Sequence, residues 1–212
     1  MGKLHVGTFV TVDGVMQAPG GPDEDRDGGF EHGGWSFHYW DEAMGQRIAE
    51  STLRADALLL GRRTYEIFAA HWPNIGDDDP VAAKLNSVPK YVASRTLDEV
   101  TWDNSTLIEG DVAEAVAKLK EEINGEIQVT GSATLLQTLI EADLVDSYEL
   151  WVFPLVLGTG KRLFGSGAIP AAFKVVDSQT SSTGVAIQVY ERAGEVRYGS
   201  FALEGEAATR QP

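Results

Sequence analysis

The sequence predicts an α/β protein whose mostly parallel mixed sheet carries helices on both faces and ends in an antiparallel C-terminal hairpin. Three observations lead to this fold class. Short apolar runs bounded by glycine or proline alternate with segments of helical periodicity over most of the chain. Such alternation favours a parallel sheet that is covered on both sides. Strand-like segments then follow one another near the C-terminus, which indicates antiparallel pairing.

The predicted strands are runs of apolar, β-branched and aromatic residues that end at turn-forming residues. The first strand begins at Leu4 and breaks at Asp13 and Gly14. A long strand over 146–158 contains Pro154, which cannot donate to a β-ladder and therefore marks an irregularity or a sheet edge. The other predicted strands cover 57–61, 90–95, 105–110, 126–131, 173–183, 185–192 and 196–203.

Helices are predicted where apolar residues recur every three or four positions behind a capping residue. Asp41 can cap a helix over 41–55, and Asp111 can cap a helix over 111–123. The other predicted helices cover 63–72, ended by Pro73, and 132–144, with a helical turn at 81–85.

These elements form one predicted domain over residues 1–203, followed by a flexible tail over 204–212. Neither an internal repeat nor a linker divides the domain. Residues 19–34 are rich in glycine and acidic side chains, and they form a loop that is long for a compact domain. A loop of this length is expected to be functional or mobile.

The composition excludes several classes of function. The 212-residue chain has 17 basic and 32 acidic side chains, a formal net charge of −15, and no cysteine. Nucleic-acid binding draws most of its affinity from cationic side chains, so no nucleic-acid partner is expected. No segment has the length of a membrane span or the pattern of a secretory signal, which predicts a cytoplasmic protein without a membrane partner. No metal site is expected, and the histidines are interpreted as structural or surface residues, because cysteine is absent and metal-ligand spacing is lacking at His5, His32, His38 and His71.

Three predicted strands end in residues that suit a small anion. Two arginines and a threonine follow the strand over 57–61, Ser94 and Arg95 end the next strand, and a Gly-Ser pair ends the strand over 126–131. Ligands of open α/β sheets bind beyond the carboxyl ends of the strands, and a helix N-terminus offers free N–H groups to phosphate. Arginine adds a planar, permanently charged fork. Together the three strand ends predict a phosphorylated dinucleotide at one edge of the sheet.

Each strand end also has a simpler interpretation. An arginine after a strand is usually solvated, and Gly-Ser at a helix start is usually a turn and a cap. Neither a G-x-G-x-x-G fingerprint nor a Walker loop is present. The joint occurrence of the three strand ends is what favours a nucleotide site.

Longer stretches resemble a known family. The segments "LLLGRRTYE", "YVASRTL" and "IQVTGSATLLQTLIEADLVDSYELWVFPLVLGTGKRLF" resemble the dihydrofolate-reductase-like fold, and "TVDGVMQ" matches the Ser/Thr-x-Asp-Gly turn of that family. The resemblance is strongest to the reductase domain of the bifunctional riboflavin-biosynthesis deaminase-reductase and its stand-alone relatives, over roughly residues 3–192. It implies an NADPH-dependent reductase that acts on a small heterocyclic, pterin- or pyrimidine-like substrate.

The resemblance also assigns residues to NADPH. The implied contacts are Phe9, Thr11, Met16 and Gln17 beside the nicotinamide; Gly61, Arg62, Arg63 and Thr64 at the adenosine-side phosphates; Ser94 and Arg95 near the 2′-phosphate and adenine; and Gly131, Ser132, Ala133, Thr134 and Leu135 at the pyrophosphate. Lys161 belongs to a Gly-x-Gly-Lys-Arg-Leu-Phe stretch typical of the riboflavin-type branch, and its alternative interpretation is a solvated turn.

The substrate side carries fewer signals. The aromatic side chains within 35–40 can wall a pocket for a flat ring, or they can be ordinary packing. Protonation of an imine-type nitrogen calls for a buried carboxylic acid with a raised pKa. Asp41 is the candidate for this catalytic acid, and helix capping is its alternative role.

Two other functions stay open at this point. The protein could be a non-catalytic nucleotide-binding protein that kept the fold and lost the chemistry, or it could hold a flavin or another nucleotide in place of NADPH. Relatives of this kind pair through sheet edges or C-terminal strands, so the resemblance implies a homodimer.

Overall fold

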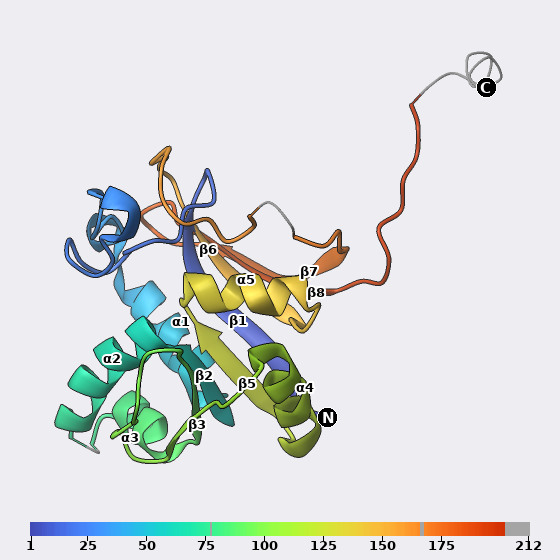
Figure 1. Ribbon diagram of the computed structural model, residues 1–212. Helices are drawn as coiled ribbons and strands as arrows, with labels where there is room; N and C mark the ends of the chain where they lie inside the picture. Colours follow the sequence, from blue (N-terminus) through green and yellow to red (C-terminus); the bar gives the residue numbers. More distant parts are fainter. Residues whose placement is uncertain (77, 166–167, 202–212) are drawn as a thin grey trace.

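The computed structural model describes residues 1–76, 78–165 and 168–201, and it contains one eight-stranded sheet (Figure 1). The strand order is β4-β3-β2-β5-β1-β6-β8-β7. The strands are β1 (Lys3–Thr11), β2 (Ala57–Gly61), β3 (Lys90–Ala93), β4 (Ser105–Leu107), β5 (Glu126–Thr130), β6 (Ser147–Phe153), β7 (Phe173–Thr180) and β8 (Ala186–Arg192). The first six strands pair in parallel, and β8 and β7 add to β6 as an antiparallel hairpin, so the predicted fold class is confirmed.

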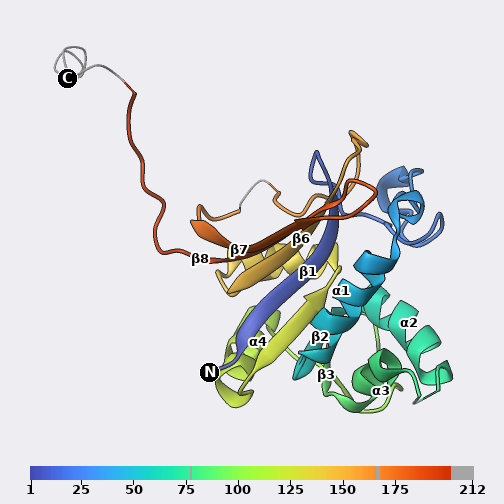
Figure 2. The same cartoon turned by 180° about the vertical axis from the view of Figure 1, so that it is seen from behind.

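The helices cover both faces of this sheet. They are α1 (Glu42–Leu53), α2 (Arg62–His71), α3 (Pro80–Ser87), α4 (Val112–Glu122) and α5 (Ala133–Glu141). Short 3-10 turns cover Asp27–Gly29, Phe37–Tyr39 and Trp72–Asn74. Helices α4 and α5 lie in front of the sheet in Figure 1, and α1 lies in front of it when the molecule is seen from behind in Figure 2.

The alternation of side chains along β1 explains the two faces. Leu4, Val6 and Val10 point into an apolar cluster that includes buried residues of α4 and α5. Residues 5, 7 and 9 point to the opposite face, because successive side chains of a strand alternate. Phe9 packs there in a second cluster with Met44 of α1. Gly7 lies between His5 and Phe9 on this face of β1, so no side chain covers the sheet at that position.

The capping residues act as the sequence predicts. Asp41 accepts a hydrogen bond from the Met44 N–H at 2.8 Å, and Asp111 accepts one from the Glu114 N–H at 2.9 Å. Both helices therefore begin directly after an aspartate, where a side-chain oxygen satisfies a free N–H group. Strand β6 ends at Phe153, one residue before Pro154, because proline has no N–H to continue the ladder.

The strand predicted over 196–203 is wrong for its described part. Residues 196–201 have no regular secondary structure, and Tyr198 and Phe201 are exposed. The segment runs away from the sheet in Figure 1 and pairs with no strand. A β-prone composition does not make a strand without a partner that completes its ladder. The predicted tail over 204–212 lies outside the described residues.

Candidate functional site

The three predicted strand ends meet at one edge of the sheet. Strands β3, β2 and β5 are neighbours and run parallel, so their carboxyl ends lie side by side. A cavity of about 1140 Å³ opens there and extends under α1. All the residues that the resemblance assigns to NADPH except Thr11 line this cavity: Phe9, Met16, Gln17, Gly61, Arg62, Arg63, Thr64, Ser94, Arg95, Gly131, Ser132, Ala133, Thr134 and Leu135.

The ends of β2 and β5 are joined through Ser132. Its hydroxyl accepts the Gly61 N–H at 3.0 Å and lies 2.8 Å from the Thr64 hydroxyl. A Cβ on Gly61 would lie 3.2 Å from Ser132 Oγ and 3.3 Å from its Cβ, so a larger residue would push the two strand ends apart. Glycine at position 61 is therefore explained by close approach of the two strand ends.

The approach to α5 has an unusual backbone. Gly131 and Ser132 both have positive φ angles, of 59° and 64°. Serine rarely adopts this left-handed conformation, and its contacts with Gly61 and Thr64 hold it there. Helix α5 starts at Ala133, so its free N–H groups lie at the cavity wall. This arrangement suits a phosphate group.

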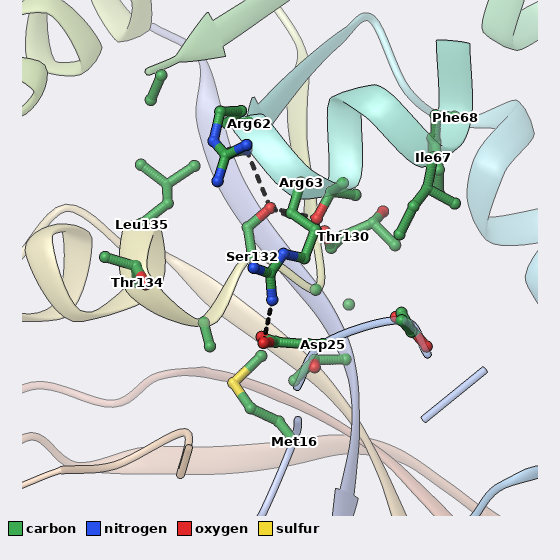
Figure 3. Close-up of a pocket in the computed structure, with 18 of the residues that line it drawn as sticks. Met16, Asp25, Arg62, Arg63, Ile67, Phe68, Thr130, Ser132, Thr134 and Leu135 are labelled. Carbon is green, nitrogen blue, oxygen red and sulfur yellow. Dashed lines mark hydrogen bonds and ion pairs between the residues drawn. The ribbon is translucent and has the colours of Figure 1, made fainter. Parts of the chain in front are cut away.

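The cavity's three arginines have different partners. Arg62 pairs with Glu66 one helical turn away, at 3.2 Å. Arg63 reaches across the cavity to the 19–34 loop, where it pairs with Asp25 (Figure 3). It also pairs with Asp27 at 3.0 Å. Arg95 is exposed, and within the described ranges no ion pair is found for it. Arg95 is therefore the arginine whose charge is most available to a ligand.

The acidic loop is held over the cavity by Lys161 and Gln17. Lys161 Nζ lies 2.7 Å from Asp25 and 2.7 Å from Asp27. The Gln17 side chain donates to the carbonyls of Asp25 and Asp27 and accepts the Lys161 N–H at 2.9 Å. We call the four side chains Arg63, Lys161, Asp25 and Asp27 the loop latch. The two carboxylates form ion pairs with Arg63 and Lys161, which are cations that a phosphate could otherwise contact.

The latch carboxylates stay ionised. Hydrogen bonds from Lys161 and Arg63 lower the pKa of Asp27 to about 2. Burial alone would raise the pKa of Asp25, but Lys161 and Arg63 outweigh it and lower that pKa. The pairing of Asp27 is therefore complete above the ordinary aspartate pKa and is lost only as the pH falls through about 2.

The same loop brings Glu24 into the cavity wall. Glu24 Oε2 accepts the N–H groups of Gly20 and Gly21 at 2.6 and 3.1 Å. Burial raises the pKa of Glu24. A raised pKa is the property predicted for the catalytic acid, for which Asp41 was the candidate. Glu24 was missed because burial within a glycine-rich acidic loop has no signature in sequence.

The structure does not bring Asp41 to the cavity. One carboxylate oxygen caps α1, and the other accepts the Ser182 N–H at 2.9 Å and its hydroxyl at 2.6 Å. These bonds, led by that of the Ser182 hydroxyl, lower the pKa of Asp41. The prediction of a raised pKa for Asp41 is therefore wrong, because the hydrogen bonds that its carboxylate accepts stabilise the ionised form.

Thr11 and the aromatic segment also have packing roles. The buried Thr11 hydroxyl donates to Asp13 and accepts the Val15 N–H, which shapes the turn after β1. Trp35 and Tyr39 pack edge-on against Phe153 in the apolar cluster beneath α1. Neither lines the cavity, so ordinary packing is the correct interpretation of these two side chains.

A buried polar cluster under α1 was also missed. The Glu149 side chain is 1% exposed, and it pairs with Arg47 of α1 at 2.7 Å. Ser51 Oγ and Arg54 lie 3.2 and 3.6 Å from its other oxygen. Burial would raise the pKa of Glu149, but His5 and Arg47 outweigh it and hold the pKa below its usual range. Alternation along β6 could have indicated that Glu149 faces the same side as Trp151, but not that it would be paired there.

Comparison with known proteins agrees with this architecture. The model of the RibD C-terminal domain matches residues 3–187. The chain belongs to the RibD C-terminal domain family. This membership confirms the resemblance to riboflavin-type reductase domains.

Two members of the Bacillus subtilis (strain 168) proteome are similar in sequence. The uncharacterized protein YyaP is 35% identical over 145 residues, which are 66% of this chain and 75% of YyaP. The uncharacterized protein YwjB is 29% identical over 109 residues, which are 51% of this chain and 58% of YwjB.

Two solved structures share the fold of the family. A protein from Shewanella sp. PV-4 that is named for riboflavin biosynthesis superposes with a TM-score of 0.68 at 23% identity, covering 91% of this chain and 99% of that one. A pyrimidine reductase-like protein from Corynebacterium diphtheriae has a TM-score of 0.58 at 12% identity, covering 91% and 92%. At these identities the likeness concerns the fold.

Proposed function

We propose that this protein is an NADPH-dependent reductase of a small heterocyclic, pterin- or pyrimidine-like substrate. The observation that carries the proposal is the convergence of three anion-suited strand ends on one cavity in a chain of the RibD C-terminal family. NADPH, when bound, supplies a hydride from its nicotinamide ring. The residues of the chain bind the two reactants, orient them and exclude water.

The cavity residues fit a phosphorylated dinucleotide. The N-terminus of α5 with Gly131 and Ser132 would hold the pyrophosphate, and Arg95 would hold the additional phosphate that distinguishes NADPH from NADH. Phe9 and Met16 would provide the apolar surface for the nicotinamide. Glu24 would hold the proton that a reduced ring nitrogen accepts, since its pKa is raised by burial.

Titration with NADPH and NADH, followed by tryptophan fluorescence, tests the cofactor. Arg95→Ala should weaken NADPH binding about ten- to a hundredfold, because a charge-assisted hydrogen bond contributes roughly 1.5–3 kcal/mol, and should leave NADH binding almost unchanged. Arg54→Ala is the matched control, since Arg54 lies outside the cavity lining. Absence of saturable NADPH binding to the unmodified protein would end the proposal.

Oxidation of NADPH in the presence of pterins, pyrimidines and quinones tests the reaction. Glu24→Gln should lower the turnover number about a hundredfold, as expected for loss of a general acid, while NADPH affinity is retained. A protein that binds NADPH but oxidises it with none of these compounds would support the non-catalytic alternative instead. A yellow purified protein would point to a flavin.

We also propose that two copies pair through β7. This strand lies at the sheet edge, and all its residues after Phe173 are exposed. Val175 and Val176 are 51% and 46% exposed, which is unusual for β-branched residues of a strand. Light scattering on the purified protein measures the mass directly, and a monomer at micromolar concentration would contradict this proposal.

A further inference from the structure

The tip of the acidic loop is held over the cavity by charge and not by apolar packing. Residues 23–29, "DEDRDGG", form this tip and contain no apolar side chain, and all four of its acidic residues line the cavity. In the described part of the chain, the side chains beyond the loop that bond or pair with the tip are those of Arg63, Lys161 and Gln17. Polar contacts therefore keep the tip in place, since it has no hydrophobic surface to bury.

The base of the loop is fastened to the body of the protein by other means. The Gly34 N–H donates to the Ala18 carbonyl at 2.8 Å, and Ser36 Oγ donates to the Pro19 carbonyl at 2.7 Å. Phe30, directly after the tip, is 6% exposed and packs in an apolar cluster that includes Ala18. These contacts do not involve the tip, so the tip can move while the base stays in place.

Pairs of glycines flank the charged part of the tip. Gly20 and Gly21 lie before it, and Gly28 and Gly29 lie after it. The φ angles of Gly28 and Gly29 are 68° and 74°, which favour glycine, and a Cβ on either residue would meet no atom within 4 Å. Hinges are a few loop residues that absorb changes in backbone angles, and glycine does so at the least steric cost.

The loop latch is electrically balanced before any ligand binds. Asp25 and Asp27 each contact both Arg63 and Lys161, so two negative and two positive charges lie together. A phosphate group carries about 1.5–2 negative charges near pH 7. If it bound beside both carboxylates, it would add this charge as an excess inside a partly enclosed cavity, where repulsion is stronger than in water. If it replaced the carboxylates, the balance would be kept.

We propose that the loop tip is an autoinhibitory lid, in which Asp25 and Asp27 act as an internal anion that a phosphate-bearing ligand must displace from Arg63 and Lys161. This inference rests on the proposed function for the identity of that ligand, NADPH, and it adds a regulated step to its binding. Only molecules with an open lid offer both cations to the ligand. The apparent affinity is therefore reduced in proportion to the open fraction.

Two nitroxide labels measure the position of the lid directly. The chain has no cysteine, so introduced cysteines are the only thiols to label. Arg26→Cys places one label on the tip, and Lys118→Cys places the other on α4, which lies at the far end of the sheet from the loop in Figures 1 and 2. Double electron–electron resonance gives the distribution of distances between the labels, and one distance should predominate in the unliganded protein.

Sodium pyrophosphate tests whether an anion displaces the lid. It should raise the population of a second, open distance about tenfold, because the ligand binds the open state alone. Sodium chloride at equal ionic strength should have a much smaller effect, because screening weakens ion pairs without replacing them. Equal open populations in the two salts, or no second distance in pyrophosphate, would overturn the inference.

Variants without ligand test whether the latch closes the lid. In the labelled protein, Asp25→Asn with Asp27→Asn should raise the open population about tenfold, because Arg63 and Lys161 lose their carboxylate partners. Asp98→Asn with Glu99→Gln removes two exposed charges outside the cavity lining and should leave the distances unchanged. An open population no larger in the latch variant than in this control would contradict the lid.

NADPH, added to the same labelled protein, separates the lid from the proposed function. Opening by both NADPH and pyrophosphate would support both proposals. Opening by pyrophosphate, together with no binding of NADPH, would refute the proposed function and leave the lid in place. Saturable NADPH binding to a protein whose lid stays closed would refute the lid and leave the proposed function in place.

Discussion

The loop latch and the buried pair of Glu149 and Arg47 under α1 both join charges of opposite sign, but they do so in different surroundings. In the latch, the side chains of Lys161 and Asp27 are 30% and 56% exposed, and the carboxylates come from an irregular loop. In the buried pair, the side chains of Arg47 and Glu149 are 17% and 1% exposed, and Glu149 comes from β6 within the sheet. Exposed pairs can exchange partners at small cost, whereas a buried charge must keep its partner. The latch carboxylates are therefore suited to exchange for a ligand, whereas the Glu149–Arg47 pair is suited to a fixed structural role.

The largest effect is expected where a buried charge loses its partner. Glu149→Ala should lower the free energy of unfolding by about 3 kcal/mol, because Arg47 keeps its charge in a largely buried position and retains only the half-exposed Asp177 as a partner. Urea denaturation followed by circular dichroism measures the change.

Asp177→Asn is the matched control for that substitution. Asp177 pairs with the same arginine at 2.7 Å, but its side chain is 49% exposed. Its loss should cost less than about 1 kcal/mol. Similar losses for the two variants would show that burial does not separate the two regions.

A smaller effect is expected when the latch is opened. The double variant Asp25→Asn with Asp27→Asn frees Arg63 and Lys161 from their carboxylates, so NADPH affinity should rise about tenfold at low salt. The gain should shrink at high salt, because exposed charges are screened. Fluorescence titration at two salt concentrations measures both.

A double variant of equal charge controls for long-range electrostatics. The double variant Glu31→Gln with Glu42→Gln also removes two negative charges, but from residues outside the cavity lining. An equal gain in NADPH affinity from this control would mean that net charge, and not the latch, limits binding.

The smallest expected effect is a gain in stability at Gly7. Gly7→Ala should raise the free energy of unfolding by about 0.5–1 kcal/mol, because alanine restricts the unfolded chain and its Cβ meets no atom within 4 Å. Thermal unfolding measures it. Gly61→Ala, where the Cβ would crowd Ser132, should instead destabilise the protein.

Much of the architecture could be predicted from local signals. The apolar run "ALLLG" predicted strand β2, and Asp41 and Asp111 predicted where α1 and α4 begin. The segment over 196–203 shows the limit of such signals, since its composition predicts a strand but no partner completes the ladder in its described part. Strand formation depends on tertiary pairing, and periodicity alone does not report it.

The sequence by itself determined the α/β class, the helix caps and the three anion-suited strand ends, because these depend on neighbouring residues. Only the tertiary structure decided which carboxyl groups matter. It bound the second oxygen of Asp41 to Ser182, brought Glu24 and Asp25 from the loop to the cavity, and buried Glu149 beside His5 of the neighbouring strand. The ionisation of a carboxyl group depends on its burial and on partners that are far away in the chain, and the neighbouring residues in the sequence predict neither.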